Sequence, residues 1–489
     1  MNILEKLGIF GWKRQDENIM FASMLTGEPL LMLAEHGTSK TGAAALFAKS
    51  LGFKYHAYDA SKDLFDDVVG FVDIEALKNG KVKYIESEVT IFDKEFALID
   101  EINRTKKEMQ SKWLEILRSR TIMGMATKLN WVWAACNPLN YTGTNAMDEA
   151  LIGRFAYFLY PPTVSQMTKN DRIKIASNIS VSDLPGIGYW SETTDSKLDI
   201  DFEKVGNIMK GIISRAAKHF DALREEMPEI PRLVSDFGKL VLDSSKGRIN
   251  LDGRRLGYIT RAIFAVRAIE IARSEISKDE ISSLKDCIKY TLYATIPTSI
   301  NDDTVNTEED MHIIDQTIEM MSKYIRDRID NNGIDKIYRL FTSQHIDEIA
   351  SLLLCEDLPD MAKRRAWETL LSNQDQNTSL LAIIAAHIEV EYPNTLPAGI
   401  GGEFRKVINP DKFLYSSLPR LTGKYIKDAN DIKRLMEFPN TKMEKYIMVH
   451  ILEKYMNRDQ FSYDTILEEF KTAIVGIKKV IDRFLSEAA

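Results

Sequence analysis

Two short stretches of the chain contain residues whose types and order suit the binding and cleavage of a nucleotide. The first is Ala34-Glu35-His36-Gly37-Thr38-Ser39-Lys40-Thr41, which follows an apolar run and precedes an alanine-rich, helix-forming segment. In a phosphate-binding loop, backbone N–H groups and a helix N-terminus face the phosphates, a lysine supplies positive charge, and a hydroxyl holds Mg²⁺. Lys40 is therefore the candidate for the phosphate contact and Thr41 for the metal ligand. His36, Gly37, Thr38 and Ser39 are candidates for the phosphate cradle.

The second stretch, Phe96-Ala97-Leu98-Ile99-Asp100-Glu101-Ile102-Asn103-Arg104, is an apolar strand that ends in two carboxylates. Asp100 is suited to bind Mg²⁺ through water, and Glu101 to polarise an attacking water. Each stretch has an ordinary interpretation by itself, as a helix start with a lysine or as a solvated strand end. Their order and their separation of about sixty residues fit a βαβ unit with an insertion. Together they predict a nucleotide hydrolase.

Five apolar runs predict strands that are buried on both faces, at 30–33, 53–58, 96–99, 131–136 and 156–160. Helical segments at 41–51 and 107–118 follow the first and the third run. Short apolar strands that alternate with helices indicate a parallel sheet covered on both sides. Ligands bind beyond the carboxyl ends of the strands in such sheets, and both stretches lie at strand ends.

Composition limits the classes of function. The 489 residues are 44% apolar and 28% charged, which is ordinary for a globular protein. The net charge of −8 argues against nucleic acid as the main partner, because phosphate neutralisation needs a basic surface. The three cysteines and seven histidines are scattered, so neither disulfides nor a zinc site is expected. We expect a cytoplasmic protein with no membrane insertion, because there is no signal-peptide character and no apolar run of ~18 residues.

The chain is long enough for two or three domains. We predict an α/β nucleotide-binding core at 1–162, which Pro161-Pro162 ends, a helical lid at 163–297 and a helical C-terminal domain at 298–489 for a client or partner. Two hairpin insertions are expected in the core, at 72–88 around Asn79-Gly80 and at 121–129 around Gly124. The lid has a predicted loop at 185–188 and helices at 202–224 and 256–276. The C-terminal domain has predicted breaks at 331–333, Pro359, 393–402 and Pro439.

Several motifs resemble the MoxR branch of the AAA+ ATPases. They are Asp100-Glu101-Ile102-Asn103-Arg104, then Ala135-Cys136-Asn137-Pro138-Leu139-Asn140-Tyr141-Thr142-Gly143-Thr144, then Asp148-Glu149-Ala150-Leu151-Ile152-Gly153-Arg154-Phe155, and finally Leu251-Asp252-Gly253-Arg254-Arg255-Leu256. The resemblance covers roughly residues 25–160, fades beyond about 280, and does not extend to 301–489. It implies a P-loop AAA+ fold with a five-stranded parallel sheet sandwiched by helices, a helical lid and a further helical C-terminal domain.

The resemblance also implies roles for three residues. Asn137 would be the first sensor, which orients the attacking water or touches the γ-phosphate. Its ordinary interpretation is an asparagine that bonds its own turn before Pro138. Arg154 looks like the arginine finger offered to a neighbouring subunit, although an arginine at a helix end is also favoured by the helix dipole. Arg255 would be the second sensor in the lid, with the adjacent Arg254 as the alternative.

The sequence departs from the family's loop at two positions. The family normally has glycine where this chain has Ala34 and Ser39. Glycine eases unusual backbone angles and close phosphate approach, so a modest nucleotide affinity is predicted if the angles are restricted.

The resemblance implies ATP and Mg²⁺ as cofactors and a homo-hexameric ring, because an arginine finger needs a neighbour. It further implies a MoxR-like chaperone that remodels, assembles or activates a protein client, possibly with a separate von Willebrand A domain protein as partner. Two alternatives stay open. One is a weakly hydrolysing, nucleotide-gated binding scaffold. The other is a McrB-like, NTP-driven motor associated with DNA, which the acidic balance disfavours.

Overall fold

The computed structural model describes residues 2–62, 65–105, 107–139, 141, 143–177, 200–298, 304–326, 328–343, 345–372, 429–457 and 462–488. They fall into two compact units. Unit 1 is Met1–Asp315 with Arg326–Ile329, and unit 2 is Gln316–Ile325 with Asp330–Ala489. The loop predicted at 185–188, the break predicted at 393–402, and Asn140 and Thr142 of the second motif lie outside the described residues. The domain boundaries at 162 and 297 stay predictions.

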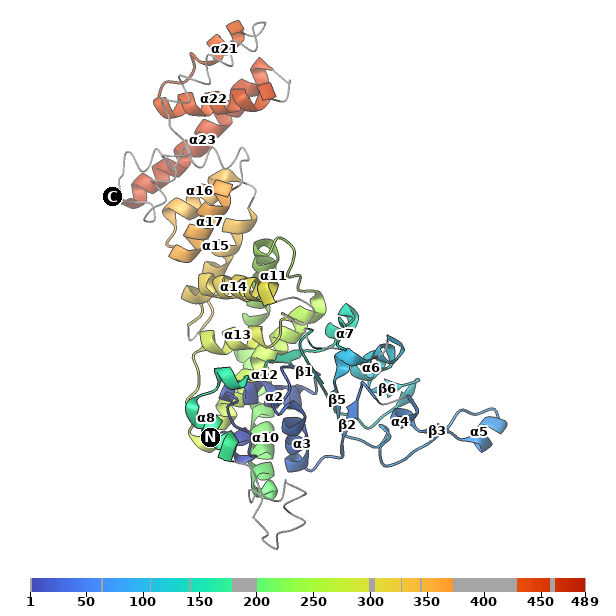
Figure 1. The fold of residues 1–489 in the computed structure, drawn as a ribbon. Helices are drawn as coiled ribbons and strands as arrows, with labels where there is room; N and C mark the ends of the chain where they lie inside the picture. Colours follow the sequence, from blue (N-terminus) through green and yellow to red (C-terminus); the bar gives the residue numbers. More distant parts are fainter. Residues whose placement is uncertain are drawn as a thin grey trace. The chain divides into compact units, whose positions relative to one another are not determined.

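A five-stranded parallel sheet forms the centre of unit 1 and confirms the predicted fold class (Figure 1). Its strands lie in the order β2 (Tyr55–Asp59), β5 (Phe96–Asp100), β8 (Trp131–Cys136), β1 (Leu30–Leu33) and β9 (Tyr157–Leu159). Each strand lies within two residues of its predicted bounds. Because every pair is parallel, the carboxyl ends of all five strands meet at one edge.

Side chains alternate between the two faces of the sheet, and both faces are buried. On one face, Ala97 and Val132 belong to a core that includes Trp113 and Ile116 of α6 (Lys107–Ser119). On the other face, Trp133 packs against Phe47 of α3 (Lys40–Leu51), which in turn contacts Phe21 of α2 (Arg14–Thr26). Burial on both sides explains why the strands are continuous apolar runs.

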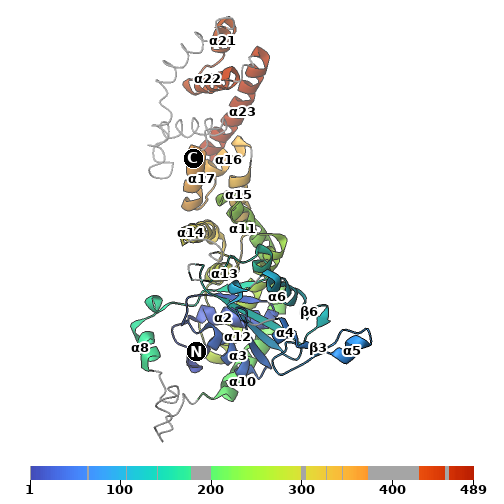
Figure 2. The same cartoon turned by 45° about the vertical axis from the view of Figure 1, so that its right-hand side comes forward.

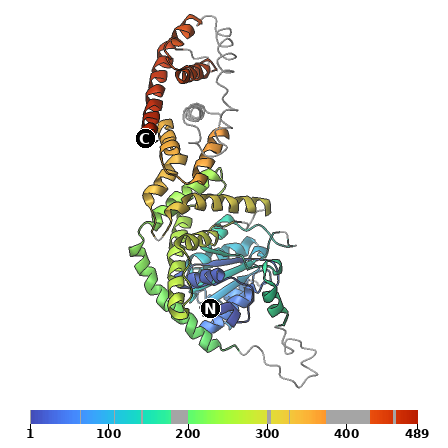
Figure 3. The same ribbon diagram turned by 90° about the vertical axis from the view of Figure 1, so that its left-hand side faces the viewer.

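Two long helices pack against each other, one of them against α3 and the other against α2. Figure 3 shows α10 (Phe202–Glu226) and α12 (Gly253–Ser277) side by side, and α10 also contacts α3. The helices α3, α6, α10 and α12 confirm the helical segments predicted at 41–51, 107–118, 202–224 and 256–276. The remaining described helices of unit 1 are α1 (Ile3–Lys6), α4 (Phe65–Val69), α5 (Ile74–Lys78), α7 (Glu149–Ile152), α8 (Lys169–Ser177), α11 (Ile230–Ser244), α13 (Leu284–Tyr293), the first part of α14 (Thr304–Met321) and the 3-10 helices η1 (Ile102–Arg104) and η2 (Val164–Gln166).

The first insertion is not the tight hairpin predicted from Asn79-Gly80. Strands β3 (Phe71–Val72) and β4 (Tyr84–Ile85) do pair antiparallel, but α5 (Ile74–Lys78) lies between them. Asp73 begins α5 by accepting the N–H groups of Glu75 and Ala76, and Asn79 with Gly80 ends it. The Asn-Gly pair is therefore a helix end, because the Asp73 cap stabilises a helix in the residues that precede it. Figures 1 and 2 both show α5 away from the five-stranded sheet.

The second insertion is a hairpin, as predicted. Strands β6 (Thr121–Ile122) and β7 (Met125–Ala126) pair antiparallel around Met123 and Gly124. These two residues have φ angles of 53° and 75°. Positive φ at both central residues is the signature of a two-residue type I′ turn, which matches the twist of the flanking strands.

The described elements of unit 2 with assigned bounds are all helices. Unit 2 contains the end of α14 (Thr304–Met321), η4 (Ser322–Tyr324), α15 (Asn331–Thr342), α16 (Ile346–Cys355), α17 (Asp360–Ser372), α21 (Ala429–Leu435), α22 (Lys442–Asn457) and α23 (Tyr463–Ala488). The predicted breaks at Pro359 and Pro439 are confirmed. Residues 331–333 instead form the first turn of α15, because Asp330 caps the N–H groups of Asn332 and Gly333. In the described part of the chain, no helix is long and apolar enough to cross a membrane.

A glycine in α10 permits its close packing on α3. A Cβ added to Gly206 would lie 1.9 Å from the carbonyl oxygen of Ser50. We therefore expect Gly206→Ala to lower the free energy of unfolding by about 1–3 kcal/mol, because backbone must move to admit the methyl group. Gly211→Ala on the same helix is the control, since its Cβ would meet Ile276 at an ordinary 3.6 Å. Urea unfolding followed by tryptophan fluorescence measures both. Equal stability of the two variants would contradict the expectation.

Candidate active site

The loop between β1 and α3 contains one strained residue. Ser39 has φ 62° and ψ 24°, in the left-handed region, whereas Gly37 has φ 79°. A residue with a side chain costs about 1–3 kcal/mol in such a conformation. Ala34 is outside the left-handed region, so its departure from the family's glycine carries no such cost. The strain predicted for the loop is thus located at Ser39.

The loop offers free hydrogen-bond donors. The N–H groups of Gly37, Thr38 and Ser39 have no acceptor among the residues that the structure describes. They lie just before the N-terminus of α3, where the helix dipole favours negative charge. A row of unpaired N–H groups at a helix N-terminus is suited to an anion such as phosphate.

Lys40 is buried at the start of α3, and its ammonium is surrounded by oxygen acceptors. Its Nζ donates to the carbonyl oxygens of Ala34 at 2.6 Å and Glu35 at 2.9 Å, and to Oδ1 of Asn137 at 3.2 Å. Burial lowers the pKa of Lys40, while the nearby carboxylates of Asp100 and Glu101 act in the opposite direction. The site thus holds a positive charge in place without a direct ion pair to that charge.

Thr41 and Asp100 meet as the sequence predicted. The hydroxyl Oγ1 of Thr41 donates to Oδ2 of Asp100 at 2.6 Å. A hydroxyl beside a carboxylate is a hard-oxygen donor pair of the kind that Mg²⁺ prefers, with the remaining positions left for water and phosphate oxygens. Among the described residues no group of three or more His, Cys, Asp or Glu side chains could hold a metal alone. The oxygen chemistry of the pair fits Mg²⁺.

Glu101 follows β5 and is held by several polar contacts. Its φ of 52° is left-handed, and its N–H donates to Oδ1 of Asp100 at 2.9 Å. Its carboxylate accepts from Nη1 of Arg104 at 3.1 Å and from Nδ2 of Asn137 at 3.5 Å. Asn103 supports this arrangement, because its buried amide donates to the main-chain oxygen of Asn137 at 2.7 Å. Asn103 and Arg104 belong to the motif quoted above, but sequence reasoning gave them no role.

One cavity of about 490 Å³ brings these residues together. Its lining contains all predicted members of the loop, both carboxylates and Asn137, and the complete set is His36, Gly37, Thr38, Ser39, Lys40, Thr41, Gly42, Ala57, Asp59, Lys62, Asp100, Glu101 and Asn137. Sequence reasoning missed Asp59 and Lys62, which form an ion pair at 2.8 Å. The available signal was the position of Asp59 directly after the apolar run at 53–58, which matches the position of Asp100 after the run at 96–99. In the structure, the two aspartates pair in register.

Two predicted arginines do not line this cavity. Arg154 follows α7, and its Nε is buried without a partner among the described residues. Arg255 is buried elsewhere, where its Nη1 donates to the carbonyl oxygens of Phe155 at 2.8 Å and Thr295 at 3.0 Å. Burial lowers the pKa of Arg255 to about 10. The guanidinium of Arg255 is thus hydrogen-bonded to main-chain carbonyl oxygens, while the side chain of the adjacent Arg254 is exposed.

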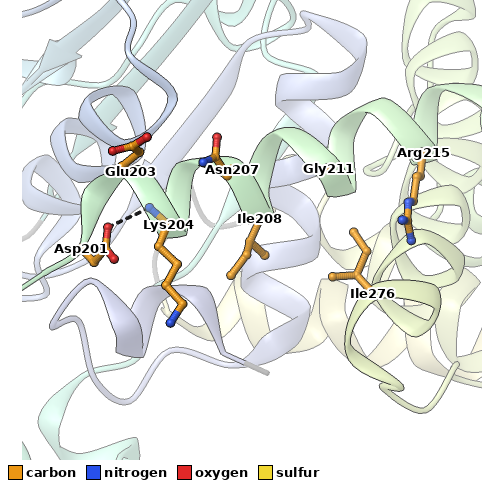
Figure 4. A pocket seen from close by; sticks show the side chains of 8 residues that line it. All are labelled: Asp201, Glu203, Lys204, Asn207, Ile208, Gly211, Arg215 and Ile276. Carbon is orange, nitrogen blue, oxygen red and sulfur yellow. Dashed lines mark hydrogen bonds between the residues drawn. The ribbon is translucent and has the colours of Figure 1, made fainter.

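Another hollow, of about 550 Å³, runs along α10 and contains none of the predicted site residues. Figure 4 shows its lining, which includes Lys204, Asn207 and Arg215 of α10 and Ile276 of α12. Its charged residues are of both signs, and the dashed bond in the figure joins Asp201 to the main-chain N–H of Lys204, an ordinary helix cap. This hollow carries no arrangement suited to chemistry.

Comparison with known proteins agrees with this geometry. Residues 29–157 match the family model described as the ATPase family associated with various cellular activities (AAA). This segment is an AAA-family ATPase domain. The matched range begins beside β1, ends in β9 and includes the whole cavity lining together with Arg154.

Two individual proteins are also similar to this chain, one in sequence and one in structure. The uncharacterized protein YeaC of Bacillus subtilis (strain 168) is 30% identical over 152 residues, which are 30% of this chain and 47% of that protein. The chain thus spans about half the length of the curated relative that it matches. A crystal structure from Cytophaga hutchinsonii ATCC 33406, described as a candidate ATPase, aligns with 65% of this chain and 92% of its own, at 16% identity and a TM-score of 0.45.

Proposed function

We propose that this chain is a Mg²⁺-dependent ATP hydrolase of the MoxR type, which works as a ring and acts on a protein partner. The contact between Thr41 and Asp100, at the rim of a cavity that also holds Lys40 and Glu101, carries the hydrolase part of the proposal. Phosphate, metal and water each have a matching group in this one cavity.

Each group has a defined task in phosphoryl transfer. The loop N–H groups and Lys40 would bind the phosphates and offset charge that builds up on the transferring group. Thr41 and Asp100 would hold Mg²⁺, which neutralises charge on the phosphate oxygens. Glu101 would polarise the attacking water, and Asn137, in contact with both Lys40 and Glu101, would keep that water in line.

A weakly hydrolysing scaffold is the second candidate function, and two observations favour it. Ser39 strains the loop, and Arg104 occupies one oxygen of the Glu101 carboxylate. Both features oppose fast turnover. A McrB-like motor on DNA has less support, since the chain has a net charge of −8.

Glu101→Gln separates hydrolysis from binding. The amide keeps the size of the side chain but cannot draw a proton from water, so we expect ATP binding to persist while turnover falls at least about 100-fold. Lys40→Ala is the matched variant that should lose binding as well. Phosphate release measures the turnover of each variant. Competition between ATP and GTP measures binding and the nucleotide preference. Unchanged turnover in Glu101→Gln would remove Glu101 from the mechanism, and parent turnover that is insensitive to Lys40→Ala would favour the scaffold.

Arg154 supports the ring. Its side chain lies outside the cavity of its own chain, and its Nε is buried without a partner among the described residues. Its main-chain oxygen accepts from the hydroxyl of Tyr258 at 3.4 Å, which ties the residue to α12. An arginine that is held in place but not used in its own site is suited to the nucleotide of a neighbouring subunit. A homo-hexamer is the form that the MoxR resemblance implies.

Mixed rings test this assignment. We expect Arg154→Ala to lose hydrolysis, because no positive charge reaches the neighbour's phosphates, and Glu101→Gln to lose it for the reason above. Mixing the two variants should restore part of the activity, since some interfaces then combine an intact Glu101 with an intact Arg154. Phosphate release is measured across mixing ratios. The absence of any recovery in rings that do exchange subunits would rule out catalysis across the interface.

The first insertion is the candidate contact for a protein partner. Seven large apolar side chains of the insertion and its two immediate neighbours in the chain are between 38% and 69% exposed, and they are Phe71, Val72, Ile74, Leu77, Val82, Ile85 and Val89. Exposed apolar surface of this density marks an interaction site in a folded protein. The two-stranded pairing of β3 with β4 holds this surface away from the core.

Serines at Ile74 and Leu77 test this contact. We expect the parent ATPase to be stimulated by a permanently unfolded protein, reduced and carboxymethylated α-lactalbumin, and the double variant to lose that stimulation at unchanged basal rate. The matched control places serines at Ile173 and Ile175 of α8, which are 52% and 40% exposed. Equal stimulation of both variants, or none of the parent, would contradict a role of the insertion in binding unfolded segments.

A further inference from the structure

A tryptophan from the N-terminal segment contacts the phosphate-binding loop directly. The indole Nε1 of Trp12 donates to the carbonyl oxygen of Thr38 at 3.3 Å, in a buried environment. Trp12 does not line the cavity, whereas Thr38 and Ser39 do. The indole therefore contacts the loop from outside the cavity that would hold the phosphates in the proposed function.

This hydrogen bond fixes the direction of the next N–H group. The peptide unit between Thr38 and Ser39 is planar and trans, so its C=O and N–H point in opposite directions. Holding the Thr38 oxygen toward Trp12 turns the Ser39 N–H away from Trp12 and toward the cavity. That N–H has no acceptor among the described residues, so it is available to a phosphate oxygen.

The same peptide unit leads into the strained residue. Ser39 adopts φ 62° although it carries a side chain. A strained backbone conformation persists only where surrounding contacts determine it. At the family's glycine position such a contact would be dispensable, because glycine adopts this angle freely. With serine there, the indole N–H supplies the missing restraint.

Trp12 is itself held firmly. Asn2 donates its amide to the main-chain oxygen of Trp12 at 3.4 Å. Further along, Glu17 of α2 is fully buried and accepts from the N–H of Leu4 at 2.7 Å and from Arg273 of α12 at 2.8 Å. The segment that presents the indole lies between α1 and α2, and Glu17 of α2 joins both α1 and α12, so the two ends of the segment are anchored.

We infer that Trp12 is a positioning residue for nucleotide binding: its indole N–H holds the Thr38–Ser39 peptide so that the loop keeps its phosphate-binding form despite the serine. This inference rests on the proposed function, since it concerns the affinity of the same site. It predicts a coupling between positions 12 and 39 that a purely structural tryptophan would not show.

A double-mutant cycle tests the coupling. Trp12→Phe, Ser39→Gly and the double variant of the full chain are titrated with the fluorescent nucleotide mant-ADP and Mg²⁺. Trp12→Phe keeps an aromatic ring but loses the donor, so we expect its Kd to rise about three- to tenfold. In the Ser39→Gly background the same change should raise Kd less than about twofold, because glycine needs no restraint.

Trp131→Phe is the matched control. Its indole also donates to a carbonyl oxygen, that of Met24 at 2.9 Å, but at the amino end of β8. We expect its Kd to equal that of the parent chain. Circular dichroism and melting temperatures accompany every variant.

The outcomes separate the inference from the function on which it rests. Equal binding by the parent and Trp12→Phe, or an equal loss in both backgrounds at position 39, overturns the inference alone. The single variant Ser39→Gly gives a test that does not depend on whether Trp12→Phe folds. It should bind mant-ADP at least as tightly as the parent chain, and weaker binding overturns the inference. Failure of the parent to bind mant-ADP overturns the proposed function and the inference together.

Discussion

The site depends on the common direction of five buried strands. Because all strand pairs are parallel, β1, β8 and β5 end at one edge, and the polar residues that follow them meet there. β8 lies between the other two, so Asn137 at its end stands between Lys40 and Glu101 and contacts both. The loop after β1 crosses this strand, and Thr41 reaches Asp100 at 2.6 Å.

The charged side chains of Lys40 and Glu101 at this edge have hydrogen-bond partners within the protein. Lys40 is bonded to two carbonyl oxygens of its own loop, and Glu101 to Arg104 and Asn137. Unpaired buried charges would destabilise the fold, so these contacts stabilise this edge of the sheet. In the proposed function, phosphate oxygens would replace the carbonyl contacts of Lys40, and the net affinity would be the difference in free energy between the two sets of hydrogen bonds.

The parts of the structure that sequence could predict are those set by local pattern. The five strands follow from apolar runs, and Thr41 with Asp100 follows from the rule that such strands share an edge. Contacts between distant segments had no such signal. Arg255 is bound by carbonyls from two other segments, and Trp12 meets the loop 26 residues later in the chain. Asn79-Gly80 failed differently, because the Asp73 cap favours a helix where the dipeptide suggested a turn.

Two residues with left-handed backbone flank the cavity although neither is glycine. Ser39 and Glu101 have φ angles of 62° and 52°, and each is held by contacts from outside its own element. Ser39 follows a carbonyl that is bonded to Trp12, while the carboxylate of Glu101 is bonded to Arg104 of η1 and Asn137 after β8. Strain of this kind survives only where packing elsewhere supports it. The fold therefore stabilises a prearranged edge, so that phosphate and water would meet groups already in place rather than groups ordered on binding.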